Sequence, residues 1–268
     1  MSLPCAIPHL SAHMTTASGS LTHLVFETLA YFVAARWYWR TRSAGVQPSP
    51  RDRFLLLGCA VFGAAIGSKG LHVLEHLPTL IARHDVVLWL GGKSVLGGFL
   101  GGTVGVELGK RAIGWRAATG DAWVTPICIG LVIGRIGCQV AGLWDQTYGN
   151  PTTLPWAWDY GDGVPRHPVA AYEILAVGLL FLAVRNRWAN HPGARFAALL
   201  FGYCILRFFL EWLKPPFGPL AVGTLPVALY GALTAIQWAA LLGLAWFGVL
   251  FRRRIATFAP DAPLPSPS

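Results

Sequence analysis

Long apolar stretches alternate with short polar segments along the whole chain. A helix needs about 20 mostly apolar residues to cross the hydrocarbon core of a bilayer. Seven stretches approach or exceed this length: 21–39, 54–81, 86–109, 119–142, 168–186, 194–213 and 225–251. The pattern predicts an all-α integral membrane protein, a polytopic bundle of about seven transmembrane helices that forms a single membrane domain over 1–268.

The third stretch differs from the others because it is rich in glycine. Gly97, Gly101 and Gly105 recur every four residues, and Gly98 lies beside the first of them. This spacing leaves one helix face without side chains, so that a neighbouring helix or a lipid can approach closely. Gly97 and Gly98 are therefore candidates for either helix packing or substrate binding. The pair Gly91-Gly92 is expected to begin the stretch with a broken or re-entrant turn.

Composition and charge sharpen this interpretation. Hydrophobic residues make up 54% of the chain and charged residues 12%, with a formal net charge of +9. These values exclude a disordered chain, a disulfide-framework protein and a typical soluble enzyme. Fourteen Lys and Arg residues fall on one side of the predicted spans and three on the other, which predicts an outside N-terminus and a cytoplasmic C-terminus. The positive charge is thus mainly a topology signal, and no nucleic-acid partner is expected.

Several ionisable residues lie at predicted membrane depth, where they are costly and usually functional. Arg135 lies between Gly134 and Gly137 at the end of an apolar run. Its guanidinium group presents donors in a fork that suits a phosphate or a carboxylate, and the glycines leave room for a bulky headgroup. We expect a lipid phosphate partner, with a structural ion pair as the alternative.

Two further spans carry charges that could join Arg135. Arg207 and Glu211 are four residues apart, so they share one helix face. Glu173 lies about two turns into the fifth span, and His167 lies at its outer mouth. The sequence favours a buried charged network that lines a cavity over a self-contained Arg207–Glu211 pair.

The segment 143–166 connects two spans on the predicted outer side. It contains Trp144, Trp156 and Trp158 together with Asp145. Tryptophan prefers the membrane–water interface. We expect a Trp-rich loop on the outer leaflet, with an ordinary interfacial loop as the alternative.

One short motif points to different chemistry. His72, Glu75 and His76 match the pattern H-x-x-E-H, which in some metalloproteases supplies two zinc ligands and a general base. No third ligand is evident on a following element. An intramembrane metalloprotease that uses these residues remains a remote alternative.

The charged and glycine-rich motifs together resemble the prolipoprotein diacylglyceryl transferase family, over about 54–215 and in the right order. The signature Gly-Arg-x-Gly-Asn resembles 134–138, and the family's outer loop is similar to 148–152, 154–156 and 165–168. Tyr172-Glu173 matches the end of its His-Pro-x-Gln-x-Tyr-Glu segment. Arg207 and Glu211 match its Arg-x-x-x-Glu pair.

The chain also departs from the family's pattern at several positions. Leu96 stands where the family often has a histidine before the glycine pair, and Cys138 stands at the signature asparagine. The next asparagine position falls on Ala141, and the glutamine of the fifth-span motif on Ala170. Asp145 is the candidate for the displaced acidic residue.

The resemblance implies transfer of a diacylglyceryl group from phosphatidylglycerol to the lipobox cysteine of prolipoprotein signal peptides, in the bacterial inner membrane. It implies no metal and no organic cofactor. Arg135 and Arg207, with Glu211, would meet the phosphate charge that develops in the transition state. His167, Glu173 and Asp145 are the candidates to accept the thiol proton. The implied substrate-binding residues are Gly97, Gly98, Gly134, Gly137, Cys138, Tyr148, Gly149 and Tyr172. A non-catalytic or differently specific lipid-binding paralogue is the main alternative.

Overall fold

The structure, a computed structural model, describes residues 16–41, 48–83, 86–218 and 225–256. Helices dominate the described residues. They are α1 Thr16–Thr41, α2 Pro50–Arg83, α3 Val86–Gly91, α4 Val95–Ala112, α5 Val124–Ala141, α6 Val169–Val184, α7 Ala194–Leu210 and α8 Ala235–Ala256. Three single-turn 3-10 helices precede or extend them: η1 Gly120–Trp123, η2 Gly142–Trp144 and η3 Glu211–Leu213.

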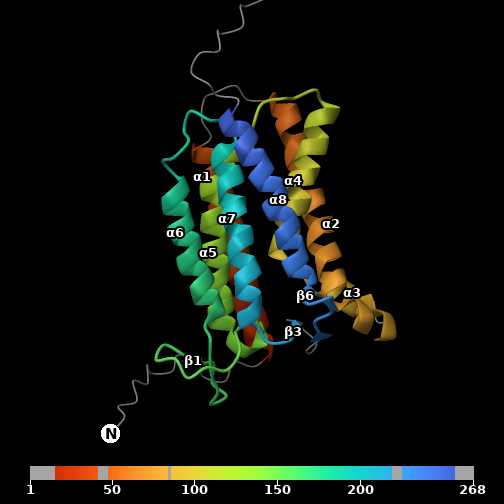
Figure 1. Ribbon diagram of the computed structural model, residues 1–268, viewed down its shortest axis with the longest axis vertical. Coiled ribbons are helices and arrows are strands. Elements are labelled where there is room, and N and C mark those ends of the chain that lie inside the picture. Colours follow the sequence, from red (N-terminus) through yellow and green to blue (C-terminus); the bar gives the residue numbers. More distant parts are fainter. Residues whose placement is uncertain (1–15, 42–47, 84–85, 219–224, 257–268) are drawn as a thin grey trace, which may run out of the picture.

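The long helices run up and down beside one another in a single bundle (Figure 1). Helix α1 packs on α5, α5 on α6, and α6 on α7, whereas α2 packs on α4. Helix α8 packs on α7 and also reaches α2 and α4. The connections α4–α5 and α6–α7 lie at the upper end of Figure 1, together with the end of α1, the start of α2 and the end of α8. The described segments that hold thirteen of the fourteen basic residues therefore gather at one end of the bundle; Arg42 lies outside the described residues.

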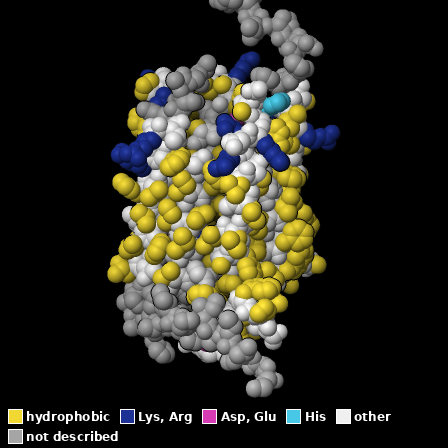
Figure 2. Space-filling model, turned by 90° about the vertical axis from the view of Figure 1, so that its left-hand side faces the viewer, with side chains coloured by type: hydrophobic (Ala, Val, Ile, Leu, Met, Phe, Trp, Pro, Cys, Tyr) yellow, Lys and Arg dark blue, Asp and Glu magenta, His cyan; other side chains and the backbone are white. Residues whose placement is uncertain are grey.

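The outer surface of the bundle is apolar along most of its length. Phe32, Phe62, Leu179 and Leu242 are each about two-thirds exposed. Figure 2 shows hydrophobic side chains over the middle of the molecule and Lys and Arg side chains in a band toward its upper end. Among the described residues, four helical segments are long and apolar enough to cross a membrane: 50–83, 120–144, 194–213 and 235–256. The protein is thus an all-α membrane protein.

The third predicted span is not one continuous helix. Helix α3 ends at Gly91, and α4 begins after Ser94, whose hydroxyl accepts a hydrogen bond from the Gly97 amide at 3.4 Å. The Lys69 ammonium group donates to the Gly92 carbonyl at 2.7 Å, which satisfies one backbone group exposed by the break. The turn expected from the glycine pair is present, but the helix after it is shorter than 86–109 predicts.

The last predicted span begins ten residues too early. Instead of a helix, 225–234 forms short antiparallel strands: β4 Leu225–Pro226 pairs with β3 Phe217–Gly218, and β5 Leu229–Tyr230 pairs with β6 Leu233–Thr234. The Tyr230 hydroxyl donates to the Leu74 carbonyl at 2.6 Å, and the Ala228 amide donates to the Glu75 carbonyl at 2.7 Å. This segment therefore covers the lower end of α2 rather than crossing the bilayer.

Helices α2 and α4 pack backbone against backbone. Gly63 and Gly67 of α2 face Gly97, Gly101 and Gly105 of α4, and a Cβ atom at any of these positions would overlap a carbonyl oxygen of the facing helix. Glycine at these sites allows the close approach that lipid-embedded helices use in place of the hydrophobic effect. This glycine seam fixes α4, and with it the segment around Leu96, against α2.

Candidate active site

The centre of the candidate site is a chain of buried charges contributed by three helices. Arg135 of α5 lies with its Nε atom 3.0 Å from Glu173 Oε2 of α6. Arg207 of α7 contacts the same oxygen at 3.4 Å and reaches Glu211 Oε2 at 3.2 Å. The Tyr203 hydroxyl donates to Glu173 Oε1 at 2.8 Å. The structure thus brings together the four charged residues that the sequence expected in one network.

The network extends to a lysine and to a further carboxyl group. Lys214 follows η3, and its Nζ atom lies 3.9 Å from Glu211 Oε2. Three cations thus face the carboxylates of Glu173 and Glu211, and the carboxyl group of Glu75 on α2 also interacts electrostatically with Arg207 and Lys214. Burial and the nearby Arg207 lower the pKa of Lys214, while Glu211 opposes this effect.

The loop 143–166 is joined to the network by backbone hydrogen bonds. The Gly149 amide donates to the His167 carbonyl at 2.9 Å, and the Asn150 amide donates to the Leu213 carbonyl at 2.7 Å. A side chain at Gly149 would overlap His167 and the Leu213 carbonyl, so the close contact requires glycine. Two short strands, β1 Trp158–Asp159 and β2 Pro165–Arg166, close the loop. Gly149 therefore has a structural role in holding the loop against the end of η3.

His167 lies in this loop beside an apolar groove of about 600 Å³. Its Nδ1 atom is 3.2 Å from the Tyr172 hydroxyl, which also accepts a hydrogen bond from Trp156 Nε1 at 2.8 Å. Leu154, Leu175 and Leu213 are among the apolar residues that line the groove. Tyr148 lies apart from it, under the Arg166 guanidinium, whose carbon is 4.8 Å from the ring centroid.

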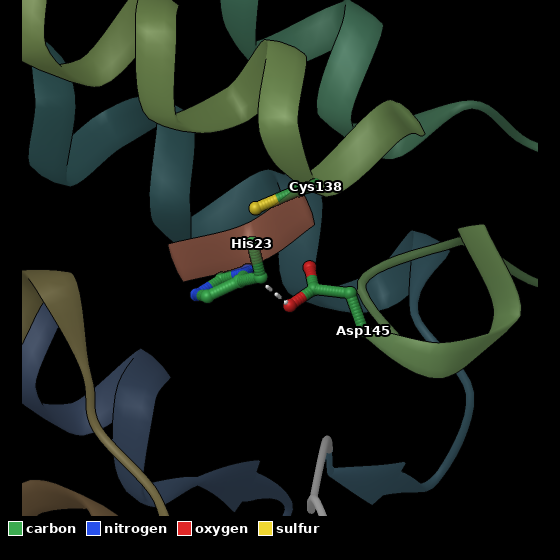
Figure 3. Close-up of side chains that lie close together, drawn as sticks. All are labelled: His23, Cys138 and Asp145. Atoms are coloured by element: carbon green, nitrogen blue, oxygen red, sulfur yellow. Dashed lines mark ion pairs between the residues drawn. The ribbon is translucent and has the colours of Figure 1, made fainter. Parts of the chain in front are cut away.

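A second polar cluster lies beside the charged network. His23 of α1, Cys138 of α5 and Asp145 after η2 point toward one another (Figure 3). The His23 Nδ1 and Asp145 Oδ1 atoms are 2.9 Å apart. Arg135 links the two clusters because its Nη1 atom donates to Cys138 Sγ at 3.6 Å. The sequence interpretation included Cys138 and Asp145 but missed His23.

Asp145 is ionised in this environment. Burial alone would raise its pKa, but the interaction with His23 and a 2.7 Å hydrogen bond from the Thr147 hydroxyl hold the pKa at about 2. Glu173 and Asp145, two candidates for accepting the thiol proton, thus both lie beside cationic or hydrogen-bond-donating partners.

The remaining glycine candidates divide into two groups. Gly97 is buried in the glycine seam, and a side chain at Gly137 would overlap Phe26 of α1. Gly98 has only distant neighbours, and Gly134 has open space beside its Cα atom. Helix packing accounts for Gly97 and Gly137, while Gly134 leaves room next to Arg135.

The H-x-x-E-H residues also lie close together near the lower end of α2. His72, Glu75 and His76 are all buried, and one ligand atom from each falls within 4.8 Å of the others. Backbone carbonyls already contact both imidazoles: His72 Nε2 lies 3.3 Å from the Leu88 oxygen and His76 Nδ1 lies 3.0 Å from the Pro226 oxygen.

Comparison with known proteins identifies the family. A family model described as prolipoprotein diacylglyceryl transferase matches residues 23–252. The chain belongs to the prolipoprotein diacylglyceryl transferase family. Three similar proteins carry the name phosphatidylglycerol–prolipoprotein diacylglyceryl transferase. The relative from Methylibium petroleiphilum is 35% identical over 71% of this chain and 78% of its own length. The relative from Aromatoleum aromaticum is 33% identical over 76% and 79%, and that from Nitrosomonas europaea is 32% identical over 58% of each chain.

Membership in this family makes the protein a transferase of a bacterial inner membrane, with several membrane-spanning helices. Leu96, where the resemblance places a histidine, is 1% exposed and packs in the main apolar core with Leu71 and Tyr203. A leucine side chain has no group that can accept or donate a proton. The thiol must therefore be activated by groups other than residue 96.

Proposed function

We infer that this protein transfers a diacylglyceryl group from phosphatidylglycerol to the lipobox cysteine of prolipoproteins. The observation that carries the inference is the buried network around Glu173, whose carboxylate holds the signature Arg135 and Arg207 side by side. The leaving group of this reaction is glycerol phosphate, whose negative charge grows as the carbon–oxygen bond breaks. Fixed cations that face this charge lower the barrier.

We assign the contact with the lipid phosphate to Arg135 and Arg207. The Arg135 side chain is 13% exposed and the Arg207 side chain 5%, so Arg135 is the more accessible of the two. Open space at Gly134 gives a headgroup room beside the Arg135 backbone. Glu173, whose two oxygens contact both arginines and the Tyr203 hydroxyl, is best understood as a positioning residue that holds the guanidinium planes. Glu211 positions Arg207 and Lys214 in the same way, through contacts with its carboxylate.

We place the substrates at the lower end of the bundle as drawn in Figure 1. The apolar groove beside His167, Tyr172 and Leu175 suits an acyl chain or the apolar segment of a signal peptide. The basic residues of the described segments gather at the upper end. Under the positive-inside rule the lower end therefore faces outward, with the N-terminus outside and the C-terminus in the cytoplasm. Labelling a single cysteine introduced at Gly163 with a membrane-impermeant reagent should succeed in intact spheroplasts, and protection of that site would contradict the orientation.

Substitution of Arg135 tests the phosphate role. Arg135→Ala should lower the rate of diacylglyceryl transfer from phosphatidylglycerol to a lipobox peptide by about 10²–10³, the usual cost of one lost transition-state donor. Arg135→Lys keeps the charge but loses the planar fork, so it should also be impaired. Arg195, which pairs with Asp121 at 3.9 Å, gives a matched control in Arg195→Ala. Full activity of Arg135→Ala would contradict the assignment.

Complementation separates the enzyme from a non-catalytic lipid-binding relative. The wild-type gene should restore growth to cells depleted of their own transferase, and the Arg135→Ala gene should not. A wild-type gene that is produced in the membrane but never restores growth would favour the lipid-binding alternative.

A further inference from the structure

We propose that the Glu75 carboxylate accepts the proton of the lipobox thiol and that His76 positions Glu75 for this step, a role that rests on the proposed transferase function. Glu75 would then supply the proton acceptor that Leu96 cannot provide. Both residues belong to the H-x-x-E-H motif of α2, to which the proposed function has so far given no role. Both are buried, with exposures of 7% and 0%.

Glu75 lies one helical turn from the position where the resemblance places a histidine. Leu71 of α2 belongs to the same core cluster as Leu96, and a Cβ atom at Gly97 would lie 2.8 Å from the Leu71 Cβ atom. Leu71 and Glu75 are four residues apart, so they share one face of α2. Glu75 is therefore one turn closer than Leu71 to the lower end of the bundle in Figure 1, where we place the substrates.

The Glu75 carboxyl group adjoins the cations of the phosphate site. It interacts electrostatically with Arg207 and Lys214, and also with the Glu211 carboxylate that positions both of them. A sulfur atom that attacks the glycerol carbon next to the phosphate must itself lie close to the phosphate. Because we assign the phosphate contact to Arg207 and Arg135, Glu75 lies beside the part of the site in which the thiol has to lose its proton.

The other buried carboxylates of the site are already engaged by close donors. Glu173 Oε2 contacts two guanidinium groups at 3.0 and 3.4 Å, and Asp145 pairs with His23 at 2.9 Å. Within the part of the chain that the structure describes, the Glu75 carboxylate makes no hydrogen bond, and its Oε2 atom lies 3.9 Å from His76 Nε2. This distance is longer than a hydrogen bond. Glu75 can therefore accept a proton from a substrate without first giving up a donor.

The contacts of His76 determine which of its ring nitrogens can accept a hydrogen bond. His76 Nδ1 lies 3.0 Å from the Pro226 carbonyl oxygen, and a carbonyl can only accept, so Nδ1 carries the ring hydrogen. Nε2 of the imidazole is then an acceptor, and this buried atom has no hydrogen-bond partner among the described residues. After a small side-chain rotation, a protonated Glu75 can donate to Nε2. This bond would stabilise the product of the proton transfer.

The proton transfer starts the bond changes of the reaction. The sulfur–hydrogen bond of the lipobox cysteine breaks as an oxygen–hydrogen bond forms on Glu75, which leaves a thiolate, the nucleophilic form of the sulfur. The thiolate attacks the glycerol carbon that carries the phosphate, and a carbon–sulfur bond forms. The carbon–oxygen bond breaks, and its electron pair leaves on the phosphate oxygen of glycerol phosphate. Glu75 then releases its proton to water, which restores the carboxylate for the next turnover.

A transfer assay with two acceptor peptides separates proton transfer from structural effects in the full-length protein. On a lipobox peptide with cysteine, Glu75→Gln should lower the transfer rate by about 10²–10⁴, the usual contribution of a general base. His76→Phe should lower the rate by about tenfold, the contribution of one hydrogen bond. In the second peptide selenocysteine replaces the cysteine, and its selenol is already ionised at neutral pH. Both variants should then come within about threefold of the wild type, because no proton has to be removed from the nucleophile.

Two controls use variants with a different expected pattern. Arg135→Ala should stay impaired with both peptides, because its defect lies in the phosphate contact. Glu107→Gln should transfer at the wild-type rate with both, since Glu107 is 47% exposed and pairs with Lys110 at 2.8 Å. A further variant adds Leu96→His to Glu75→Gln and so returns the imidazole of the family's pattern. It should recover at least about tenfold of the lost rate on the cysteine peptide.

A folded Glu75→Gln variant that transfers to the cysteine peptide at the wild-type rate would overturn the proposal and leave the transferase function intact. Equal losses on the two peptides would also overturn it, since they would show that Glu75 has only a structural role. Where Glu75→Gln fails to fold, the same comparison of the two peptides with His76→Phe decides. A folded wild type that transfers to neither peptide would instead contradict the transferase function itself.

Discussion

Glu173 is the residue whose replacement should disturb the site most, because it holds three donors at once. Arg135 and Arg207 share its Oε2 atom at 3.0 and 3.4 Å, and Tyr203 donates to Oε1. Glu173→Gln keeps the shape of the side chain but replaces one acceptor oxygen by an amide donor. At least one buried donor then loses its partner, and two guanidinium groups lose the charge between them.

The expected loss in the free energy of unfolding follows from the burial of Glu173. Glu173 is 1% exposed, and breaking a buried ion pair from one side costs about 3–5 kcal/mol. For a chain of this size, that loss corresponds to a fall of about 6–20 °C in the unfolding midpoint. Asp162→Asn is the matched control, because Asp162 holds Arg166 through two contacts of 2.6 and 2.7 Å but is 32% exposed. An exposed pair contributes about 0.2–1 kcal/mol, so this variant should change the midpoint by only a few degrees.

Thermal unfolding of both variants in the same detergent, together with a transfer assay below the midpoint, measures the effect. Glu173→Gln should also lower transfer activity because the arginine planes are no longer fixed. Equal midpoints for Glu173→Gln and Asp162→Asn would refute the reasoning, since they would show that the buried carboxylate stabilises the fold no more than an exposed one does.

Two other predictions concern packing and proton transfer. Gly101→Ala should destabilise the protein by about 1–3 kcal/mol, because the new methyl group meets the Gly63 carbonyl, whereas Gly70→Ala, with open space beside it, should be nearly neutral in the same unfolding assay. His167→Gln should keep the transfer rate within about tenfold, because His167 contacts the Tyr172 hydroxyl rather than the charged network. A loss of about two or more orders of magnitude in a folded variant would instead make His167 the proton acceptor.

Spacing along the sequence predicted the contacts within one helix, and the cost of a charge at membrane depth predicted contacts between helices. Arg207 and Glu211 meet because four residues make just over one helical turn. Arg135 and Glu173 were expected to meet because unpaired charges are rare inside a bundle. His23 was missed because its partners lie far away in the sequence, on α5 and after η2. The available signal was two ionisable residues four apart, His23 and Glu27, near the start of a mostly apolar stretch.

Apolar composition located the helices better than it located their ends. Residues 225–234 are as apolar as a span, yet Pro226 lacks an amide donor and Gly231 adopts a left-handed backbone with φ of 69°. Both features favour turns over a helix. Hydropathy does not register backbone preference, so the predicted span began in the strands that precede α8. The break near Gly91 was anticipated because there the same preference appears as a glycine pair.

The glycine seam has a consequence for how the chain is assembled during synthesis. Helices α2 and α4 are close in the sequence and fit together through bare backbone, so the pair needs no later helix to complete its contact. Helix α1 instead packs on α5, which is made only after that pair. We therefore expect α2 and α4 to associate as an early hairpin, while α1 remains in the membrane with its His23 side chain not yet paired with Asp145, which follows η2. The cluster of His23, Cys138 and Asp145 would then form late, after α5 and η2 have been made and α5 has packed on α1.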